Sequence, residues 1–408
     1  MGRRIAFTLA ALLVYRIGVY LPLPGIDIIG WSRSIGLQSR DIFGLLEIPA
    51  GGAARQTAIF ALGITPYVFA AILVQIATMI WPRLRNLSAA GDRGRDKIVA
   101  ITLYLTLLFT AFQAYGVALG LEGVHGLVMQ PGLLFELSTV LTLSAGTMLL
   151  VWLANQITAR GIGNGLALIL ALALLIDLPA TVAIAIERVR EGVVSVDRLM
   201  VGVILAATVT ALIVLVEGAR RTIVVDYPKQ AIGGTTLEDR SAELLLKING
   251  AGLIPTVIAG WLIYLPTALL SLAMTEGWRS AMFRQLAHGR PLFMILFAAF
   301  VVLLTLFYTA FVMDPDRASD TLKRYGGVVR GVAAGEPTAV YLDGVLSRVT
   351  LIGAIYLSLL FVGPEMLIAY FGLPFYLGGA PFLLVVCAVL DIGAQVRQEA
   401  AVKARGLS

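Results

Sequence analysis

Long apolar stretches recur along the whole chain and are separated by shorter polar segments. A run of roughly 20 apolar residues can cross the ~30 Å hydrocarbon core of a bilayer as an α-helix. A helix is favoured there because it satisfies its own backbone polar groups. The pattern therefore predicts ten membrane-spanning helices, at about residues 5–21, 59–81, 98–119, 133–153, 165–182, 199–216, 251–272, 291–312, 349–369 and 375–395.

The predicted spans divide into two groups of five, because a polar connection from Glu187 to Val196 separates them. We expect an N-terminal half over residues 1–190 and a C-terminal half over residues 191–408. Five spans in each half are compatible with an inverted pseudo-repeat. The predicted fold class is an all-α polytopic membrane protein with two pseudo-symmetric halves, and its long polar loops are expected at about residues 217–249 and 313–348.

One apolar segment, Ser39 to Ile48, is too short to span a bilayer although its apolar residues have helical spacing. Pro49, Gly51 and Gly52 follow it directly. One interpretation is an interfacial or packed surface helix. The other is a mobile element that folds back into a cavity and is hinged at the glycines. The periodicity leaves both interpretations open.

The composition also indicates a membrane protein, since 59% of the residues are hydrophobic, 14% are charged and the mean hydropathy is +0.89. The net charge of +6 matters less than the distribution of Lys and Arg between the two sides of the membrane. With both termini in the cytoplasm, that side holds 21 of the 31 Lys and Arg residues. This excess favours cytoplasmic termini, although external segments keep Arg188, Arg190 and Arg198, and charge alone leaves the reverse orientation open.

The residues that usually carry catalysis or bind metals are sparse. Cys387 is the single cysteine, so the chain has neither an internal disulfide nor a cysteine-based metal site. His125 and His288 fall in predicted external connections far apart in the sequence, and the motifs of zinc proteases, serine hydrolases and P-loop enzymes do not occur. We therefore expect neither an enzyme nor a bound cofactor or metal.

The second predicted span is unusual because Gly63 and Pro66 interrupt an apolar sequence, Phe60 to Gln75, that ends on a polar residue. Polar groups and helix breaks at membrane depth usually face protein or a cavity. A kinked helix with Gln75 bonded across to a neighbour is the structural alternative. The segment alone does not separate the two.

Several motifs resemble the SecY family in the order that the family has them. VYRIGVYLPLPGID (14–27) and FALGITPYVFAAILVQ (60–75) resemble its first two spans, between which the family has a short plug helix. QITARGIGNG (156–165) matches a family hallmark, although GIGNG taken alone is also typical of a helix-cap turn. The remaining motifs are GDRGRDK (91–97), FQAYGVA (112–118), KINGAGLIP (247–255), DPDRASDTLKRYGG (314–327) and PFYLGGAPFLLVV (374–386).

The resemblance implies ten helices around a central pore with a plug at about residues 39–52. It implies the central channel-forming subunit of the Sec protein translocase, which passes unfolded polypeptides across a bacterial inner membrane and releases apolar segments laterally into lipid. A ring of aliphatic side chains can seal such a pore by excluding water. The implied ring positions are Val68, Ile72, Leu166, Leu170, Val257 and Leu384, and the implied polar residues of the lateral gate are Gln75 and Asn249.

The resemblance also implies partners. These are small membrane subunits of the SecE and SecG type, a SecA-type motor ATPase or the ribosome as energy source, unfolded preproteins and membrane lipids. The resemblance implies no contact with nucleic acid other than ribosomal RNA. The implied docking residues are Arg220, Arg221, Lys229 and Arg330. The chain departs from the family at Ala333 and Ala334, where an Arg–Pro pair is usual, and Arg330 could replace the missing charge.

Two other functions fit part of the pattern. A secondary transporter would explain the broken helix and the two groups of five spans, but the sequence lacks the buried charged residues expected along an ion pathway. A non-conducting assembly protein derived from a translocase would fit the same motifs and the altered loop.

Overall fold

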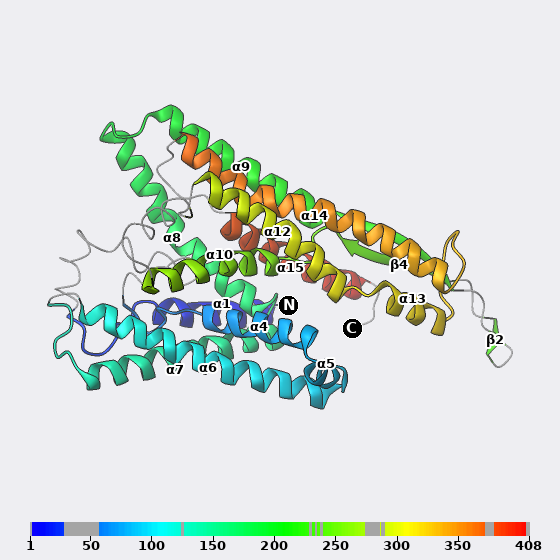
Figure 1. Ribbon diagram of the computed structural model, residues 1–408, viewed down its shortest axis with the longest axis horizontal. Helices are drawn as coiled ribbons and strands as arrows, with labels where there is room; N and C mark the ends of the chain where they lie inside the picture. The colour runs from blue at the N-terminus through cyan, green and yellow to red at the C-terminus, as the bar shows by residue number, and fades with distance from the viewer. Residues whose placement is uncertain are drawn as a thin grey trace. The chain divides into compact units, whose positions relative to one another are not determined.

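The computed structural model describes residues 2–27, 57–123, 126–227, 231–232, 235–236, 240–273, 286, 290–371 and 379–404. Most of these residues are helical (Figure 1). Each predicted span overlaps one helix: α1 (Gly2–Gly18), α4 (Thr65–Ile80), α6 (Asp92–Glu122), α7 (Leu133–Arg160), α8 (Gly165–Arg190), α9 (Val196–Gly218), α10 (Ile254–Ala273), α12 (Pro291–Val312), α14 (Glu336–Phe371) and α15 (Gly379–Ala404). The other elements are α5 (Pro82–Ala89), α13 (Pro315–Arg324), β1 (Arg220–Tyr227), β2 (Ala231–Ile232), β3 (Thr235–Thr236), β4 (Arg240–Lys247) and β5 (Val328–Val329).

Among the described residues, six helices are long and apolar enough to cross a membrane. A seventh crossing results if α4 and α5 form one span, but they meet at a bend of 108°. The bend lies at Trp81, whose extended backbone is favoured by the ring of Pro82 that follows it. The chain is therefore a mostly helical membrane protein, and the full number of ten spans stays a prediction.

The second predicted span, at residues 59–81, begins too early. Residues 57–64 form turns, Gly63 has a φ of +57°, and α4 starts at Thr65 with Pro66 in its first turn. Proline is tolerated there because the first backbone N–H groups of a helix have no partner within the helix. Gly63 and Pro66 thus mark the start of the helix and do not interrupt it.

The chain forms two compact units, residues 1–187 with 383–408 and residues 188–382. In the first unit α6 packs against both α4 and α7, and α1 packs against α7. In the second unit α12 packs against α10 and α14, and α9 packs against α14 (Figure 1). The predicted division into pseudo-symmetric halves stays a prediction.

The two segments expected to be long loops are largely folded. Strands β1 and β4 pair antiparallel through eight residues each, and β1 also pairs with β5 through Val225 and Val329, so the sheet order is β4-β1-β5. The second segment supplies β5, α13 and the first turns of α14. We call these three strands, α13 and the start of α14 the sheet unit. The buried residues of its hydrophobic cluster are Ile223, Val225, Leu246, Val329 and Leu342.

Candidate functional site

A buried cluster in the first unit, which we call the aliphatic cluster because most of its members are aliphatic, also includes Tyr15 and Phe60. Four of the six predicted ring positions belong to it or pack against it. They are Val68 on α4, Leu166 and Leu170 on α8, and Leu384 on α15. Leu166 and Leu170 are four residues apart and lie on one face of α8, as the helical repeat requires. The structure therefore brings these four positions together from three helices far apart in the sequence.

The other two ring positions lie elsewhere. Ile72 is one helical turn beyond Val68 on α4 and is 6% exposed. Val257 is half-buried on α10, in the second unit. The ring as a set of six stays a prediction.

The two residues predicted for the lateral gate have different settings. Gln75 is half-buried on α4. Asn249 is buried in the turn between β4 and α10, and so lies before the helix and not on it. Its side-chain amide donates to Glu217 Oε1 at 2.7 Å, and its Oδ1 accepts from the Gly252 backbone N–H at 3.0 Å. Asn249 therefore stabilises the turn into α10 and ties it to the end of α9.

The GIGNG segment is a helix-cap turn. Asn164 Oδ1 accepts hydrogen bonds from the backbone N–H groups of Leu166 and Ala167 at 3.0 and 3.4 Å, as an N-cap of α8 does. Gly163 has a φ of +81°, which favours glycine. At Gly165 a Cβ atom would lie 2.0 Å from the carbonyl oxygen of Ala154, so only glycine permits this close packing of α7 and α8.

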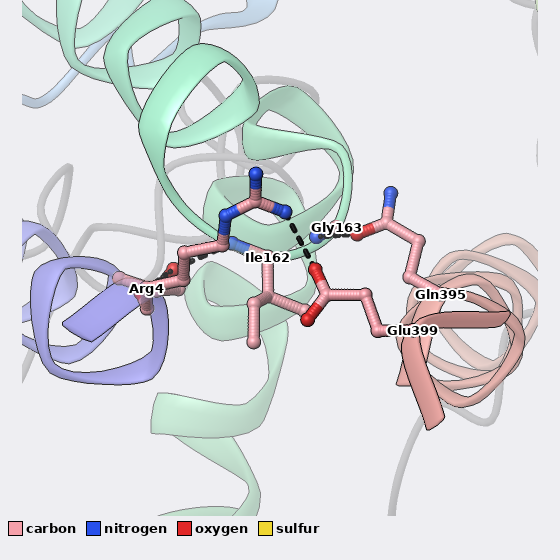
Figure 2. Close-up of polar contacts among 6 residues, drawn as sticks. Arg4, Ile162, Gly163, Gln395 and Glu399 are labelled. Atoms are coloured by element: carbon pink, nitrogen blue, oxygen red, sulfur yellow. Dashed lines mark hydrogen bonds and ion pairs between the residues drawn. The ribbon is translucent and has the colours of Figure 1, made fainter. Parts of the chain in front are cut away.

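Helices from both ends of the chain contact this turn (Figure 2). Thr8 Oγ1 on α1 accepts from the Ile162 backbone N–H at 3.0 Å, and Gln395 Oε1 on α15 accepts from the Gly163 N–H at 2.8 Å. Arg4 on α1 forms an ion pair of 2.5 Å with Glu399 on α15. We call these four side chains, Arg4, Thr8, Gln395 and Glu399, the polar clasp.

The predicted docking residues that the structure describes lie in the sheet unit. Arg220 and Arg221 are exposed at the start of β1, whereas Lys229 lies outside the described residues. Arg330, just after β5, binds Asp226 of β1 through two bonds, with Nε to Oδ2 and Nη2 to Oδ1 both at 3.0 Å. Arg330 is thus held by a carboxylate of its own chain, and its positive charge is partly balanced.

This ion pair affects the titration of both groups. The hydrogen bond from Arg330 lowers the pKa of Asp226; desolvation opposes this shift, and the charge of Arg330 adds to the lowering. The same contact raises the pKa of Arg330. Both shifts have the direction expected for an exposed bidentate pair.

The shift predicts a pH dependence of the sheet unit. The folded-state pKa of Asp226 lies below the ordinary value of 3.8. The stability that the ion pair adds to the sheet unit is therefore complete above pH 3.8 and is lost as the pH falls through the folded-state pKa. We expect the resistance of the sheet unit to pepsin, measured at each pH against an unfolded reference substrate, to fall as the pH drops below about 4. Asp226→Asn should flatten this decrease, whereas an unchanged profile would contradict the pair's contribution.

Ala333 and Ala334, which stand where the family usually has an Arg–Pro pair, are exposed and follow β5. The Ala333 carbonyl accepts from Thr338 Oγ1 at 2.7 Å, and the Gly335 carbonyl accepts from Ser319 Oγ at 2.7 Å. The backbone of the segment is therefore anchored to α13 and α14 although the usual guanidinium is missing.

Some predicted features lie outside the described residues, namely the plug at residues 39–52 and both histidines, His125 and His288. Within the part of the chain that the structure describes, no group of three or more His, Cys, Asp or Glu side chains is arranged to hold a metal ion.

Sequence reasoning missed Thr8, Gln395 and Asp226. Thr8 and Gln395 contact residues 154 and 232 positions away, and no local pattern reports such a contact. For Asp226 the sequence carried a weak signal, because RRTIVVDY is rich in β-branched residues, which are typical of a strand.

Long apolar helices, a buried aliphatic cluster and a folded polar unit between spans define a polytopic α-helical membrane protein. A family model for SecY matches residues 58–393, so the chain belongs to the SecY family. This confirms the resemblance drawn from the motifs.

Relatives and solved structures agree with that assignment. The chain is 38% identical over 403 residues to protein translocase subunit SecY of Escherichia coli (strain K12). The alignment covers 97% of this chain and 91% of the relative. A solved protein-conducting channel has a similar fold, with a TM-score of 0.66 at 17% identity over 98% of this chain and 93% of that chain. Sec61 in the canine ribosome–channel complex from the endoplasmic reticulum matches with a TM-score of 0.62 at 17% identity, over 98% and 93% of the two chains.

Proposed function

We propose that this chain is the central channel-forming subunit of a Sec protein translocase, which passes unfolded polypeptides across a bacterial inner membrane. The observation that carries the proposal is the 38% identity to a translocase subunit over 97% of the chain. The fold shared with a protein-conducting channel supports it. Apolar segments of the substrate leave the channel laterally into lipid, and the chain itself is not an enzyme.

The proposed constriction consists of Val68, Ile72, Leu166, Leu170, Val257 and Leu384, and the aliphatic cluster supports four of these positions, namely Val68, Leu166, Leu170 and Leu384. A narrow apolar ring excludes water and ions when the channel is idle, yet its side chains can fit closely around an extended polypeptide. In this proposal residues 39–52 form the plug, and Gln75 and Asn249 bias the closure of the lateral gate.

The proposed partners are SecE- and SecG-type subunits, a SecA-type ATPase or the ribosome, preproteins and lipids. The likeness to a channel found in a ribosome complex supports a docking role for polar loops. In this chain the sheet unit is the proposed docking element, since it presents Arg220 and Arg221 on a folded surface.

The docking proposal predicts the effects of three variants, two of them in the altered loop and one at Asp226 on β1. Arg330→Ala should lower motor-driven export severalfold if Arg330 supplies the contact, and Asp226→Ala should raise motor affinity because it releases the same guanidinium. Ala333→Arg should also raise affinity or translocation rate. All three are measured in reconstituted vesicles with a purified motor, and three unchanged values would exclude this segment as the coupling site.

We also propose an orientation with both termini in the cytoplasm, and this is supported by the 21 of 31 Lys and Arg residues on that side. Reporter fusions should place residues 217–249 and the C-terminus in the cytoplasm. An external reporter in the sheet unit would reverse the orientation and remove its docking role.

The function is tested directly by translocation. Vesicles that contain the chain with its small subunits, a motor ATPase and ATP should protect an unfolded preprotein from added protease, and vesicles without the chain should not. Motor binding without protection would favour the non-conducting assembly protein instead.

A further inference from the structure

We propose that Thr8 and Gln395 are positioning residues for the constriction. By binding the turn that precedes α8 from α1 and α15, they fix the register of α15 against α8 and thereby set the height of Leu384 relative to Leu170. The inference rests on the proposed pore and deepens it, because it assigns to the clasp the task of keeping the idle constriction aligned.

The first step of the argument is that α8 does not need these two side chains in order to start. Asn164 already caps its first N–H groups, and the Gly165 N–H donates to Thr158 Oγ1 at 2.9 Å. The acceptors on α1 and α15 are bound instead by the Ile162 and Gly163 N–H groups, one turn earlier. These bonds therefore join three helices, and local capping does not account for them.

The second step is that the clasp and the aliphatic cluster occupy one face of α15. Leu384, Ala388, Ile392, Gln395 and Glu399 follow one another at spacings of three or four residues, which places them on a single helical face. Ala388 is buried in the cluster, and Leu384 and Ile392 pack against it. A Cβ atom on Gly163 would lie 3.2 Å from Ile392 Cγ1, so the face meets the turn directly.

The third step is that distance along each helix sets the height of the ring residues. Helix α8 begins just after the turn, whereas α15 reaches the turn near its C-terminal end. Residues of both helices belong to the aliphatic cluster or pack against it. Leu170 lies seven residues after Gly163, roughly 10 Å along α8, and Leu384 lies eleven residues before Gln395, roughly 16 Å along α15. The two side chains are thus about one turn apart in height, and a slip of one residue would move Leu384 by about 1.5 Å and rotate it by about 100°.

The fourth step concerns what is lost when an acceptor is removed. Thr8 is 8% exposed and Ile162 is 6% exposed, so the Ile162 N–H has no ready access to water. An unsatisfied buried N–H is costly, and the turn then favours an arrangement in which that group reaches solvent. Such an arrangement shifts the turn, and with it the start of α8.

The experiment measures resting ion conductance in planar bilayers on the full chain with its small subunits. Thr8→Val and Gln395→Leu keep the side-chain size and remove the acceptor, while Thr8→Ser and Gln395→Glu keep an acceptor. Thr106→Val is the matched control, because Thr106 is buried in the same unit and its hydroxyl donates to the Thr102 carbonyl of its own helix. Each variant is made singly, and conductance is scored only for protein that elutes as a single folded species.

We expect Thr8→Val to raise resting conductance about fivefold to tenfold, which is the effect of leaving one buried N–H group without an acceptor. Gln395→Leu should raise it by a smaller factor, because Gln395 is exposed and water can partly replace its acceptor. Thr8→Ser, Gln395→Glu and Thr106→Val should stay near the unmodified chain. Cys387 gives a second readout, because it is the single cysteine and lies half-buried on α15. Its labelling by a water-soluble maleimide should accelerate in the same two variants.

The outcomes separate this inference from the proposed function. If Ile72→Ser with Leu170→Ser conducts but the clasp variants match Thr106→Val, the positioning role is overturned and the pore stands. Faster labelling of Cys387 with unchanged conductance overturns it as well, because α15 then moves without opening the constriction. If the double serine variant does not conduct, the pore assignment fails, and the positioning role fails with it.

Discussion

Serine at both Ile72 and Leu170 is expected to make the idle channel leak ions. The two side chains are 6% and 8% exposed, and Leu170 belongs to the aliphatic cluster. A hydroxyl in place of a branched carbon chain stabilises water in an apolar constriction and removes the barrier that dewetting provides. We expect resting conductance in planar bilayers to rise by about tenfold or more, since one tenfold step requires only about 1.4 kcal/mol.

The matched controls for this prediction carry serine on helices outside the ring. Ile101 on α6 and Ile355 on α14 are 38% and 56% exposed, as residues facing lipid are. Ile101→Ser and Ile355→Ser should leave conductance close to that of the unmodified chain. Equal conductance in all folded variants would contradict the constriction and favour a transporter or an assembly protein.

Aspartate at Val225 is expected to unfold the sheet unit and abolish motor-driven export. Val225 is 2% exposed on the central strand, and it pairs with Val329 of β5. Burying a carboxylate without a partner destabilises the unit by about 4 kcal/mol or more. Limited proteolysis should then cut within β1 or β4, and protease protection of the preprotein should be lost.

The control uses the neighbouring valine. Val224 is half-buried and points to the other face of the same strand, because side chains alternate along β1. Val224→Asp should preserve the protease-resistant sheet unit and most of the export. Export that survives in Val225→Asp, with the unit shown to be unfolded, would mean that the motor couples elsewhere.

The hydropathy pattern predicted the helical regions well because a bilayer imposes one simple requirement, a long apolar helix, on each span. It misplaced the start of α4, where the short turns of residues 57–64 are as apolar as the helix that follows. It also missed the sheet unit. Polarity predicted that both segments lie outside the membrane, but it did not predict that they fold together. Pairing of β1 with β5 depends on a contact between residues about a hundred positions apart, which local patterns do not encode.

The candidate site divides in the same way. Family motifs led to Val68, Leu166, Leu170 and Leu384, and the structure gathers these four in one cluster. Polar residues were harder to place, because their roles depend on partners. Arg330 was expected to be available for docking, yet it binds Asp226. The role of Gln395 depends on the position of α15 beside the turn after α7, which the sequence does not reveal.

The sheet order β4-β1-β5 also constrains the timing of biosynthesis. The hairpin of β1 and β4 can form as soon as its residues are made, but β5 follows β1 by about a hundred residues. At typical rates of chain elongation this interval lasts roughly 5 to 20 s. Throughout it one edge of β1 stays open to other strands, the kind of edge that natural sheets otherwise protect. The proposed docking surface is therefore complete only after α10 and α12 have been made, so we expect a motor that needs the whole sheet to bind only the late stages of synthesis.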